Sequence, residues 1–512
     1  MQNFKVWSTL LATTLLLAGC GLSSFPGTSG ASQNFSAKDF DNGQPPSWVQ
    51  NAIFYQIFPE RFCDGDPSND PPDTQNWETG VPTYYNYFGG DLAGIIQKMP
   101  YLHKLGITAI YFNPLFAADT NHKYTTTDYT KIDPEFGTLQ DFDRMVATAH
   151  ADGIRVILDG VFNHTSNNFW AFKDASASGP TSPYWNWYHF STFPVTNGSY
   201  WTYGGFGFMP KLNVAGCPAL QQYLLNNVVA YWTKRGIDGW RLDVPLLVQS
   251  DTFWQNFRKT VKSINPNAYI VGEAWENHGD DGRPWVQGDK FDAIMNYQFY
   301  QLVHDYFATD AINTDQFDYG MMALRGRFRQ CVTDAEFNLI DSHDTARFLH
   351  DAGEDKARLR LAATFQLTYM GAPVIYYGDE IGMTGGNDPD NRRPMAWSHP
   401  DTNMLAFYEK LIAIRKANPV LRSSQFLTLM RRNDDGQMVY ERTDGHDVIL
   451  VALNKGSQPT LTLDTTNGNL AHVSFSNGTT FTDLLSGHRY DVQNGQLVLP
   501  IGAESEAILK QD

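Results

Sequence analysis

Basic residues are scarce in this 512-residue sequence, which has 38 Lys and Arg against 55 Asp and Glu and a formal net charge of −17. Nucleic acids and anionic membrane surfaces would be repelled, so we expect neither as a partner. Cysteine is scarce as well. Cys63, Cys217 and Cys331 are the only cysteines after residue 20. They allow at most one disulfide and leave one thiol over, and their spacing suggests no metal cluster.

A long hydrophobic run is also missing at the N-terminus. The apolar stretch Val6–Leu17 is too short for a stable membrane span, but with Lys5 before it and small residues after it, it is typical of a secretory signal. It ends in Leu-Ala-Gly-Cys20, which resembles a bacterial lipobox and implies cleavage before Cys20 and lipidation of that cysteine. The alternative is an ordinary signal peptide with a chance cysteine. Residues 1–19 are thus the predicted signal peptide.

Residues 20–45 are rich in Ser, Gly and Asn, and we interpret them as a flexible tether. Together with the lipobox they predict an exported lipoprotein of the bacterial cell envelope, facing the periplasm or the exterior. A membrane would then be contacted only through the lipid anchor.

From Trp48 onward, short apolar runs alternate with helix-length segments, as in buried parallel strands separated by helices. Eight such strands are the number that closes a TIM barrel. The sequence therefore predicts an α/β fold with a (β/α)8 barrel. The eight candidate strands are Ile53–Phe58, Ala109–Asn113, Val156–Val161, Gly239–Val244, Tyr269–Glu273, Ala293–Tyr297, Asn338–Ser342 and Val374–Tyr377.

Two regions depart from this alternation. Residues 165–215 follow the third strand without a long helical period and contain several Trp, so we interpret them as an irregular inserted domain B. After residue 420 the pattern changes to short alternating strands with Asp-Gly and Asn-Gly turns. The predicted domains are a catalytic barrel at 46–419, including the insertion, and a C-terminal antiparallel β-sandwich at 420–512.

Three carboxylates, Asp243, Glu273 and Asp344, each stand where an apolar run ends. The carboxyl ends of the strands are where a βα barrel keeps its chemistry, and carboxylates converging there are the groups that cut a glycosidic bond. The alternative is that they form buried ion pairs with Arg241 and its neighbours. Acidic groups outnumber basic groups at these strand ends, which disfavours that reading.

Four segments at strand ends resemble, in order, the signature segments of the α-amylase family of glycoside hydrolases. The resemblance covers roughly Trp48 to Asp512. It implies that Asp243 is the nucleophile, Glu273 the general acid/base and Asp344 the residue that stabilises the transition state. The segments are Asp159–His164, Gly239–Asp243, Gly272–Trp275 and Ile340–Asp344.

The chemistry of a retaining glycosidase agrees with these roles, since it needs one ionised and one protonated carboxyl group. Arg241 lies two residues before Asp243 on the same strand face and is expected to keep that carboxylate ionised. Asp243 and Asp344 are expected to raise the pKa of Glu273 by charge repulsion.

Further residues are candidates for contacts with sugars. The segment 121–129 resembles the family segment in which a His and a Tyr contact the sugar before the cleaved bond, with Tyr124 as a stacking platform. The segment 387–393 resembles the one whose Asp and Arg hold the next sugar; a turn without a ligand role is the alternative. The candidate substrate-binding residues are His122, Tyr124, His164, Arg241, Trp275, His343, Asp388 and Arg392.

The loop from residue 64 to residue 70 concentrates oxygen ligands without Cys or His, which favours a hard cation such as Ca²⁺. It does not fit an EF-hand. It resembles a calcium loop of cyclodextrin-active members of the family, completed there by a downstream Gly-Gly-Asp. A solvated acidic loop is the alternative. The predicted ligands are Asp64, Asp66, Asn69, Asp70, Gly89 and Asp91.

The segment 209–213 resembles the version in neopullulanases, cyclomaltodextrinases and maltogenic amylases. Those enzymes carry an N-terminal β-domain that pairs subunits, where this sequence has the tether, so we expect a monomer. They also commonly read Val-Ala-Asn-Glu after the nucleophile, whereas residues 244–247 read Val-Pro-Leu-Leu. That difference argues against α-1,6 cleavage and strong transglycosylation.

The predicted function is a retaining hydrolase of α-1,4 bonds in maltooligosaccharides and starch, with cyclodextrins and pullulan as further candidate substrates. A transglycosylase that builds oligosaccharides or cyclodextrins is one alternative. The other is a non-catalytic sugar-binding relative, which would have lost one or more of the three carboxylates.

Overall fold

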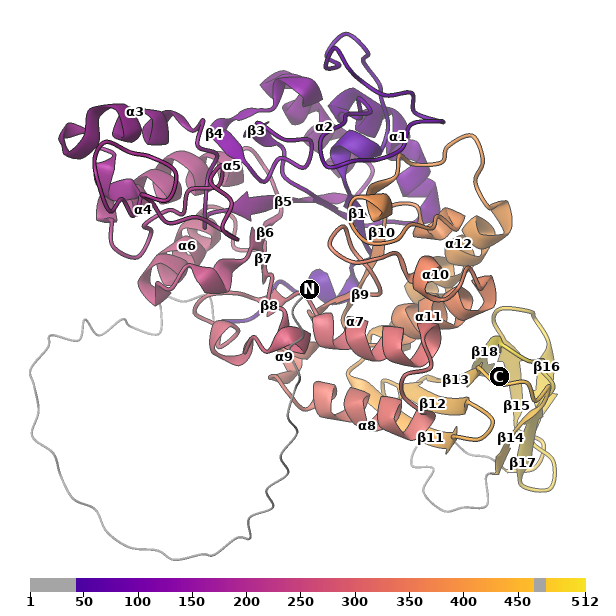
Figure 1. The fold of residues 1–512 in the computed structure, drawn as a ribbon. Coiled ribbons are helices and arrows are strands. Elements are labelled where there is room, and N and C mark those ends of the chain that lie inside the picture. Colours follow the sequence, from indigo (N-terminus) through magenta and orange to yellow (C-terminus); the bar gives the residue numbers. More distant parts are fainter. Residues whose placement is uncertain (1–42, 465–475) are drawn as a thin grey trace, which may run out of the picture. The chain divides into compact units, whose positions relative to one another are not determined.

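Eight parallel strands form the central barrel of the protein (Figure 1). The structure is a computed structural model that describes residues 43–464 and 476–512. Cys20 and the predicted signal peptide lie outside the described residues. The barrel strands are β1 (Phe54–Ile57), β2 (Ala109–Phe112), β5 (Arg155–Val161), β6 (Gly239–Asp243), β7 (Tyr269–Gly272), β8 (Ala293–Ile294), β9 (Phe337–Leu339) and β10 (Ala372–Tyr376).

The strand order is β8-β7-β6-β5-β2-β1-β10-β9, and a parallel bridge between Met295 and Phe337 joins the two ends of this sheet. Every residue of β1, β2, β6, β7 and β10 is buried, as expected for parallel strands that are covered on both faces. The eight predicted strands and the TIM barrel are therefore confirmed.

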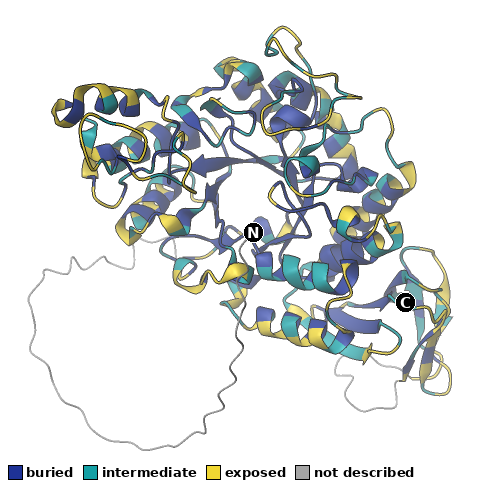
Figure 2. Cartoon of the chain, in the orientation of Figure 1, coloured by how far each residue is buried: buried dark blue, intermediate teal, exposed yellow. Residues whose placement is uncertain are grey.

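Helices surround the barrel, with buried residues on the side facing the strands and exposed residues on the outside (Figure 2). Local capping explains where several of them begin. The Asp91 side chain accepts a hydrogen bond from Gly94 N at the start of α1, and Thr138 forms a capping box with Asp141 at the start of α2. The longer helices are α1 (Leu92–Leu105), α2 (Leu139–Ala151), α6 (Asp251–Ile264), α8 (Thr314–Arg325), α11 (Lys356–Thr368) and α12 (Thr402–Ala417).

Two excursions leave the barrel on the side where the strands end. The first is the antiparallel pair β3 (Phe116–Ala118) and β4 (Thr126–Ile132), after β2. The second follows β5 and contains one short helix, α3 (Trp170–Ser178), with 3-10 turns and irregular chain. Its aromatic side chains pack on one another and on the helix that follows: Trp170 contacts Trp187 at 5.6 Å and Tyr223 of α4 (Pro218–Tyr223) at 5.7 Å between ring centroids. The predicted irregular insertion after the third barrel strand is thus observed.

The C-terminal region is antiparallel β-structure, as predicted. Its larger sheet has the order β11 (Gln425–Arg432), β12 (Gln437–Thr443), β13 (Val448–Asn454), β18 (Ser505–Gln511), β15 (Thr480–Asp483) and β16 (Arg489–Asp491). A smaller sheet pairs β14 (Leu461–Asp464) with β17 (Gln496–Leu499). Apolar residues between them form a second core, and Thr428 on β11 donates a hydrogen bond to Asp318 on α8 of the barrel.

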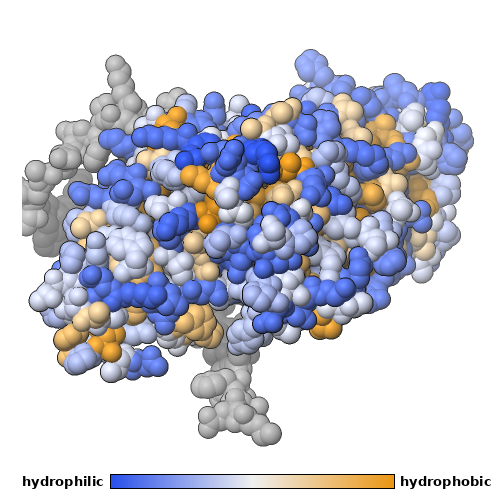
Figure 3. Space-filling view, turned by 90° about the horizontal axis from the view of Figure 1, so that it is seen from above, coloured by the Kyte–Doolittle hydropathy of each residue, from blue (hydrophilic) through white to orange (hydrophobic). Residues whose placement is uncertain are grey.

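The surface does not carry one continuous apolar patch on the face shown in Figure 3, where hydrophobic residues lie in separate groups between hydrophilic ones. Among residues 43–464 and 476–512, no helix combines the length and the apolar character needed to cross a bilayer. Cys63, Cys217 and Cys331 are all free thiols.

Candidate active site

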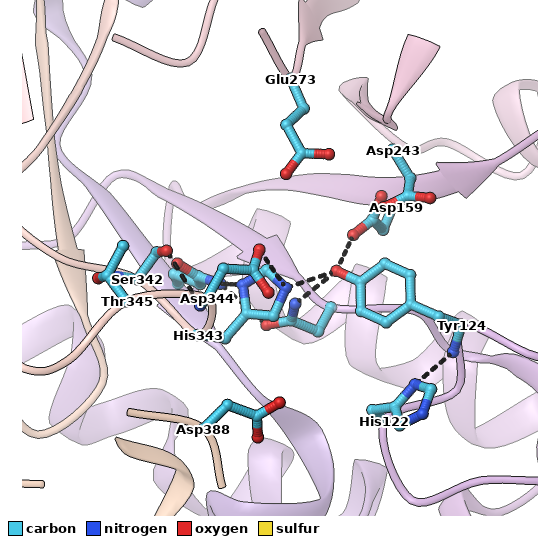
Figure 4. Close-up of polar contacts among 12 residues, drawn as sticks. His122, Tyr124, Asp159, Asp243, Glu273, Ser342, His343, Asp344, Thr345 and Asp388 are labelled. Atoms are coloured by element: carbon cyan, nitrogen blue, oxygen red, sulfur yellow. Dashed lines mark hydrogen bonds and ion pairs between the residues drawn. The ribbon is translucent and has the colours of Figure 1, made fainter. Parts of the chain in front are cut away.

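The three predicted carboxylates line one cavity at the carboxyl ends of the strands. Asp243 ends β6, Glu273 directly follows β7, and Asp344 lies in the loop after β9. The cavity has a volume of about 760 Å³, within the usual range for small-ligand sites. Asp243 and Glu273 are buried at its base, whereas Asp344 is exposed to it. Figure 4 shows the three side chains around a common space, with Asp388 pointing into it from the side opposite Glu273.

Arg241 contacts three carboxylates at once. Its Nη1 lies 3.0 and 3.1 Å from the two oxygens of Asp159 and 3.2 Å from Asp243 Oδ1, and its Nη2 lies 2.9 Å from Glu273 Oε1. The guanidinium therefore has its double contact with Asp159 and shares its charge with Asp243 and Glu273. Asp159 was not among the predicted site residues, although it ends the apolar run of the third barrel strand.

The pKa values of the carboxyl groups reflect their burial and the single guanidinium that they share. Burial, followed by the charge of Glu273, raises the pKa of Asp243 well above its ordinary value, and Arg241 opposes the shift without reversing it. The expectation that Arg241 alone keeps Asp243 ionised is therefore wrong, because the guanidinium charge is shared and the carboxylate is buried. Burial also raises the pKa of Glu273, with Arg241 opposing and Asp344 adding to the rise. The predicted direction for Glu273 is confirmed, but burial is the main cause. Three carboxylates that share one guanidinium retain a proton readily, as a site with one acid and one nucleophile requires.

Main-chain and indole donors fix the Glu273 carboxylate. Val244 N donates to Oε2 at 2.9 Å, and Trp275 Nε1 donates to Oε1 at 3.0 Å. Val244 has φ +33°, in the left-handed region that β-branched residues avoid, so the turn after β6 is strained. The Trp275 ring stacks on Tyr297 with 3.8 Å between the ring centroids. Both donors are thus held in place by the surrounding structure.

Tyr124 and His343 form a second fixed pair in the cavity wall. Their rings are stacked at 5.6 Å, and Tyr124 Oη lies 2.8 Å from His343 Nε2 and 2.8 Å from Asp159 Oδ2. Gln56 Nε2 lies 2.8 Å from His343 Nδ1, so Nδ1 accepts and Nε2 carries the proton. Burial, followed by the charges of Arg392 and Arg241, lowers the pKa of His343 well below its ordinary value. His343 is therefore a neutral donor on the cavity side.

His122 and His164 also line the cavity, and burial lowers their pKa values to about 3 and about 4. Both are neutral at physiological pH, so they can offer hydrogen bonds to hydroxyl groups without adding charge. His164 Nε2 is buried without a protein partner, and its ring stacks on Tyr203 at 4.6 Å.

Arg392 links Asp388, the other member of its predicted pair, to Asp344. It contacts Asp388 at 3.0 Å and Asp344 at 3.3 Å, and its Nε donates to the main-chain oxygen of His343. The structure thus brings all the predicted substrate-binding residues to this cavity or, for Arg241, to its base. Cavity residues that were not predicted as substrate contacts are Tyr84, Tyr85, Thr120, Tyr203, Phe206, Phe208, Met209 and Val244. Met209 and Val244 nevertheless lie in the segments 209–213 and 244–247, which the sequence already marked as distinctive.

The predicted calcium loop has free oxygen atoms. Asp64 Oδ1, Asn69 Oδ1 and Asp70 Oδ1 are buried without a hydrogen-bond partner. Burial, followed by the charges of Asp70 and Asp91, raises the pKa of Asp64 to about 6. A side chain at Gly89 would collide with Asp70 Oδ1, since its Cβ would lie 2.3 Å away. Unpaired oxygens and crowded negative charge are what a hard cation relieves.

Asp91 differs from the other candidate ligands because both of its carboxylate oxygens already accept main-chain hydrogen bonds. Its Oδ1 accepts from Gly94 N and Gly65 N, and its Oδ2 accepts from Asp66 N. No group of three or more His, Cys, Asp or Glu side chains in the described ranges is arranged to hold a metal ion. A cation here would therefore need the Asn69 amide oxygen and main-chain oxygens beside the carboxylates.

Comparisons with known proteins agree with this geometry. Residues 56–404 match the family described as Alpha amylase, catalytic domain, and residues 430–505 match Neopullulanase-like, C-terminal domain. The chain is 43% identical over 465 residues to Neopullulanase 2 from Thermoactinomyces vulgaris, covering 89% of this chain and 77% of the relative. It is 45% identical over 419 residues to a cyclomaltodextrinase from Bacillus sp, covering 80% and 74%.

A solved structure is similar over nearly the same range. The cyclic α-maltosyl-(1→6)-maltose hydrolase from Arthrobacter globiformis, in complex with cyclic α-maltosyl-(1→6)-maltose, superposes with a TM-score of 0.81 at 35% identity. The match covers 91% of this chain and 100% of that one.

Proposed function

The chain belongs to the α-amylase family of glycoside hydrolases, and we propose that it cuts α-1,4-glucosidic bonds in maltooligosaccharides and starch fragments with retention of configuration. The observation that carries this proposal is the placement of Asp243, Glu273 and Asp344 around one cavity. Nucleophile, acid and a third carboxylate are all the groups that a double displacement needs.

In the first step, Asp243 attacks the anomeric carbon while Glu273 gives its proton to the departing glycosidic oxygen. This forms a covalent glycosyl–enzyme ester and releases the shorter sugar chain. In the second step Glu273 takes a proton from water, the water oxygen bonds to the anomeric carbon, and the bond to Asp243 breaks. Asp344 and the neutral donors His164 and His343 line the cavity where the charged sugar ring would lie.

The substrate is tested by one product profile. We expect maltoheptaose and starch to yield only shorter sugars, released first as the α-anomer. Products longer than maltoheptaose would favour the transglycosylase alternative, and no products at all would favour a non-catalytic relative. Incubation with β-cyclodextrin and pullulan, read by chromatography, would show whether this chain shares the substrates for which its relatives are named.

We also propose that the loop of Asp64, Asp66, Asn69 and Asp70 binds Ca²⁺, with Gly89 giving room and Asp91 fixing the loop. The partnerless oxygens of Asp64, Asn69 and Asp70 support this proposal. Bound Ca²⁺ would relieve their repulsion and hold this loop; it takes no part in the bond-breaking steps.

Removal of Ca²⁺ with a chelator is therefore expected to lower the thermal unfolding temperature, and added Ca²⁺ to restore it. Asp70→Asn should remove most of this calcium dependence, whereas Asp73→Asn, an exposed residue nearby, should keep it. Metal analysis after dialysis gives the stoichiometry. A protein that holds no Ca²⁺ and is indifferent to the chelator would contradict the proposal.

Export and anchoring through Cys20 are further proposals, supported by the lipobox-like residues 17–20. The intact mass of the cell-envelope form should include a diacylglycerol, which Cys20→Ser should abolish. The monomeric state stays a prediction, which sedimentation would check.

A further inference from the structure

A second cavity, of about 280 Å³, is built from two loops that also contribute residues to the catalytic cavity. Tyr84 and Tyr85 line the catalytic cavity, and Val81 and Pro82 of the same loop line the second one. On the facing segment, Asp388 and Arg392 line the catalytic cavity, while Asp390 and Arg393 line the second. Tyr84 Oη donates to the main-chain oxygen of Asp388 at 2.9 Å, which ties the two loops together.

The walls of the second cavity are held by their own hydrogen bonds. Asn76 Oδ1 accepts from the main-chain nitrogens of Glu78 and Thr79 at 3.0 Å, and Asn86 Nδ2 donates to Val81 O at 2.8 Å. Trp77 Nε1 donates to Met395 O at 2.9 Å and joins one wall to the other. A ligand would therefore meet a preformed site and would not have to order these loops.

The lining combines apolar surface with planar charged groups. Trp77, Pro82 and Met395 supply the apolar part, and Val81 is 73% exposed. Arg393 Nε and Nη2 each lie 2.8 Å from an oxygen of Asp390, and both residues are partly exposed. Apolar faces suit the C–H patches of a sugar ring, and fixed carboxylate and guanidinium groups suit its hydroxyls. The volume lies just below the range for ordinary ligand pockets and fits a sugar unit or two.

We propose that this cavity binds an outlying part of the same α-glucan chain whose scissile bond lies in the catalytic cavity. A chain that passes Asp388 and Arg392 reaches the exposed rings of Tyr84 and Tyr85, which are 54% and 85% exposed, on the loop that continues into Val81. The second cavity therefore selects long linear chains over short ones. This inference rests on the proposed function, because it names the chain length that the enzyme prefers.

Two variants test the site by different means. Trp77→Ala removes the aromatic wall, and Val81→Arg fills the cavity from an exposed position whose side chain makes no hydrogen bond. For each, we expect kcat/KM on maltoheptaose to fall about tenfold, mainly through KM, since the lost contact is equal in ground and transition states. The value for maltotriose should change by less than about twofold, because a short chain does not reach the cavity. Val498→Arg, on an exposed valine of β17, is the matched control.

Binding of maltoheptaose to Asp243→Asn, with and without Val81→Arg, separates this inference from the proposed function. Weaker binding caused by Val81→Arg supports the site even if the wild type proves to be a transglycosylase. Unchanged maltoheptaose binding, or equal losses for maltotriose and maltoheptaose, would overturn the inference. Trp77→Ala also removes a hydrogen bond, so the thermal unfolding of this variant is compared with that of the wild type. If Trp77→Ala does not fold, the test of the second cavity rests on Val81→Arg.

Discussion

Asp243→Asn is expected to lower kcat on maltooligosaccharides by about 10⁴-fold or more, the largest effect of any single change in the site. The amide has the shape of the carboxylate but cannot attack the anomeric carbon, so no glycosyl–enzyme ester forms. Arg241 keeps its double contact with Asp159, so the site should stay assembled. Single-turnover kinetics on maltoheptaose would measure the loss, and binding of the same sugar should persist.

The same substitution is expected to stabilise the folded protein at neutral pH. Because burial raises the pKa of Asp243 above its unfolded value, ionising it destabilises the native state as the pH rises above about 3.9. Asn does not ionise, so the variant should unfold at a higher temperature near pH 7, with the difference shrinking toward acid pH. Asp143→Asn is the control, since Asp143 is exposed, pairs with Arg235 and is not among the residues that line the cavity. Full activity of Asp243→Asn would remove Asp243 as the nucleophile.

The convergence of Asp243, Glu273 and Asp344 on one cavity could be predicted because its signal is local. Each follows a short apolar run, and parallel strands bring such ends to one face of a barrel. The eight strands were predictable for the same reason, although β8 has only two residues because Tyr297 already begins α7 (Tyr297–Val303).

What could not be predicted depends on contacts between distant segments. Arg241 is shared between Asp159 and the carboxylates of the cavity because Asp159 is held beside it. Tyr111 of β2 and Tyr124 of the loop before β4 both donate hydrogen bonds to Asp159. The stacking of Tyr203 on His164 likewise depends on the irregular insertion. The insertion has no hydrophobic periodicity from which its backbone path could be predicted. Aromatic residues in loops give the same sequence signal whether they fill a core or line a cavity, so Tyr84 and Tyr85 were missed.

Glu273→Gln is expected to lower kcat on maltooligosaccharides by about 10³- to 10⁴-fold, because Gln cannot protonate the departing oxygen. An α-maltosyl fluoride needs no such proton, since fluoride leaves as the anion, so the first step on this substrate should be affected far less. Asp243→Asn should fail on both substrates, which separates the acid from the nucleophile. The wild-type rate should fall as the pH rises through the pKa of Glu273, which burial places above its ordinary value.

Glu409→Gln is the matched control for this variant, because Glu409 pairs with Lys104 at 2.9 Å on the protein surface and should leave both rates unchanged. On maltoheptaose, the residual rate of Glu273→Gln should no longer fall at alkaline pH, since the titrating group is gone, whereas the wild-type rate should fall. If Glu273→Gln lowered the rates on the fluoride and on maltoheptaose equally, Glu273 would not be the general acid. Its role would then be to position or charge Asp243. Because Val244 N and Trp275 Nε1 both donate to this carboxylate, Gln can keep only one of those bonds with its oxygen. We therefore expect Trp275 to reorient in Glu273→Gln, which would be seen as a change in tryptophan fluorescence.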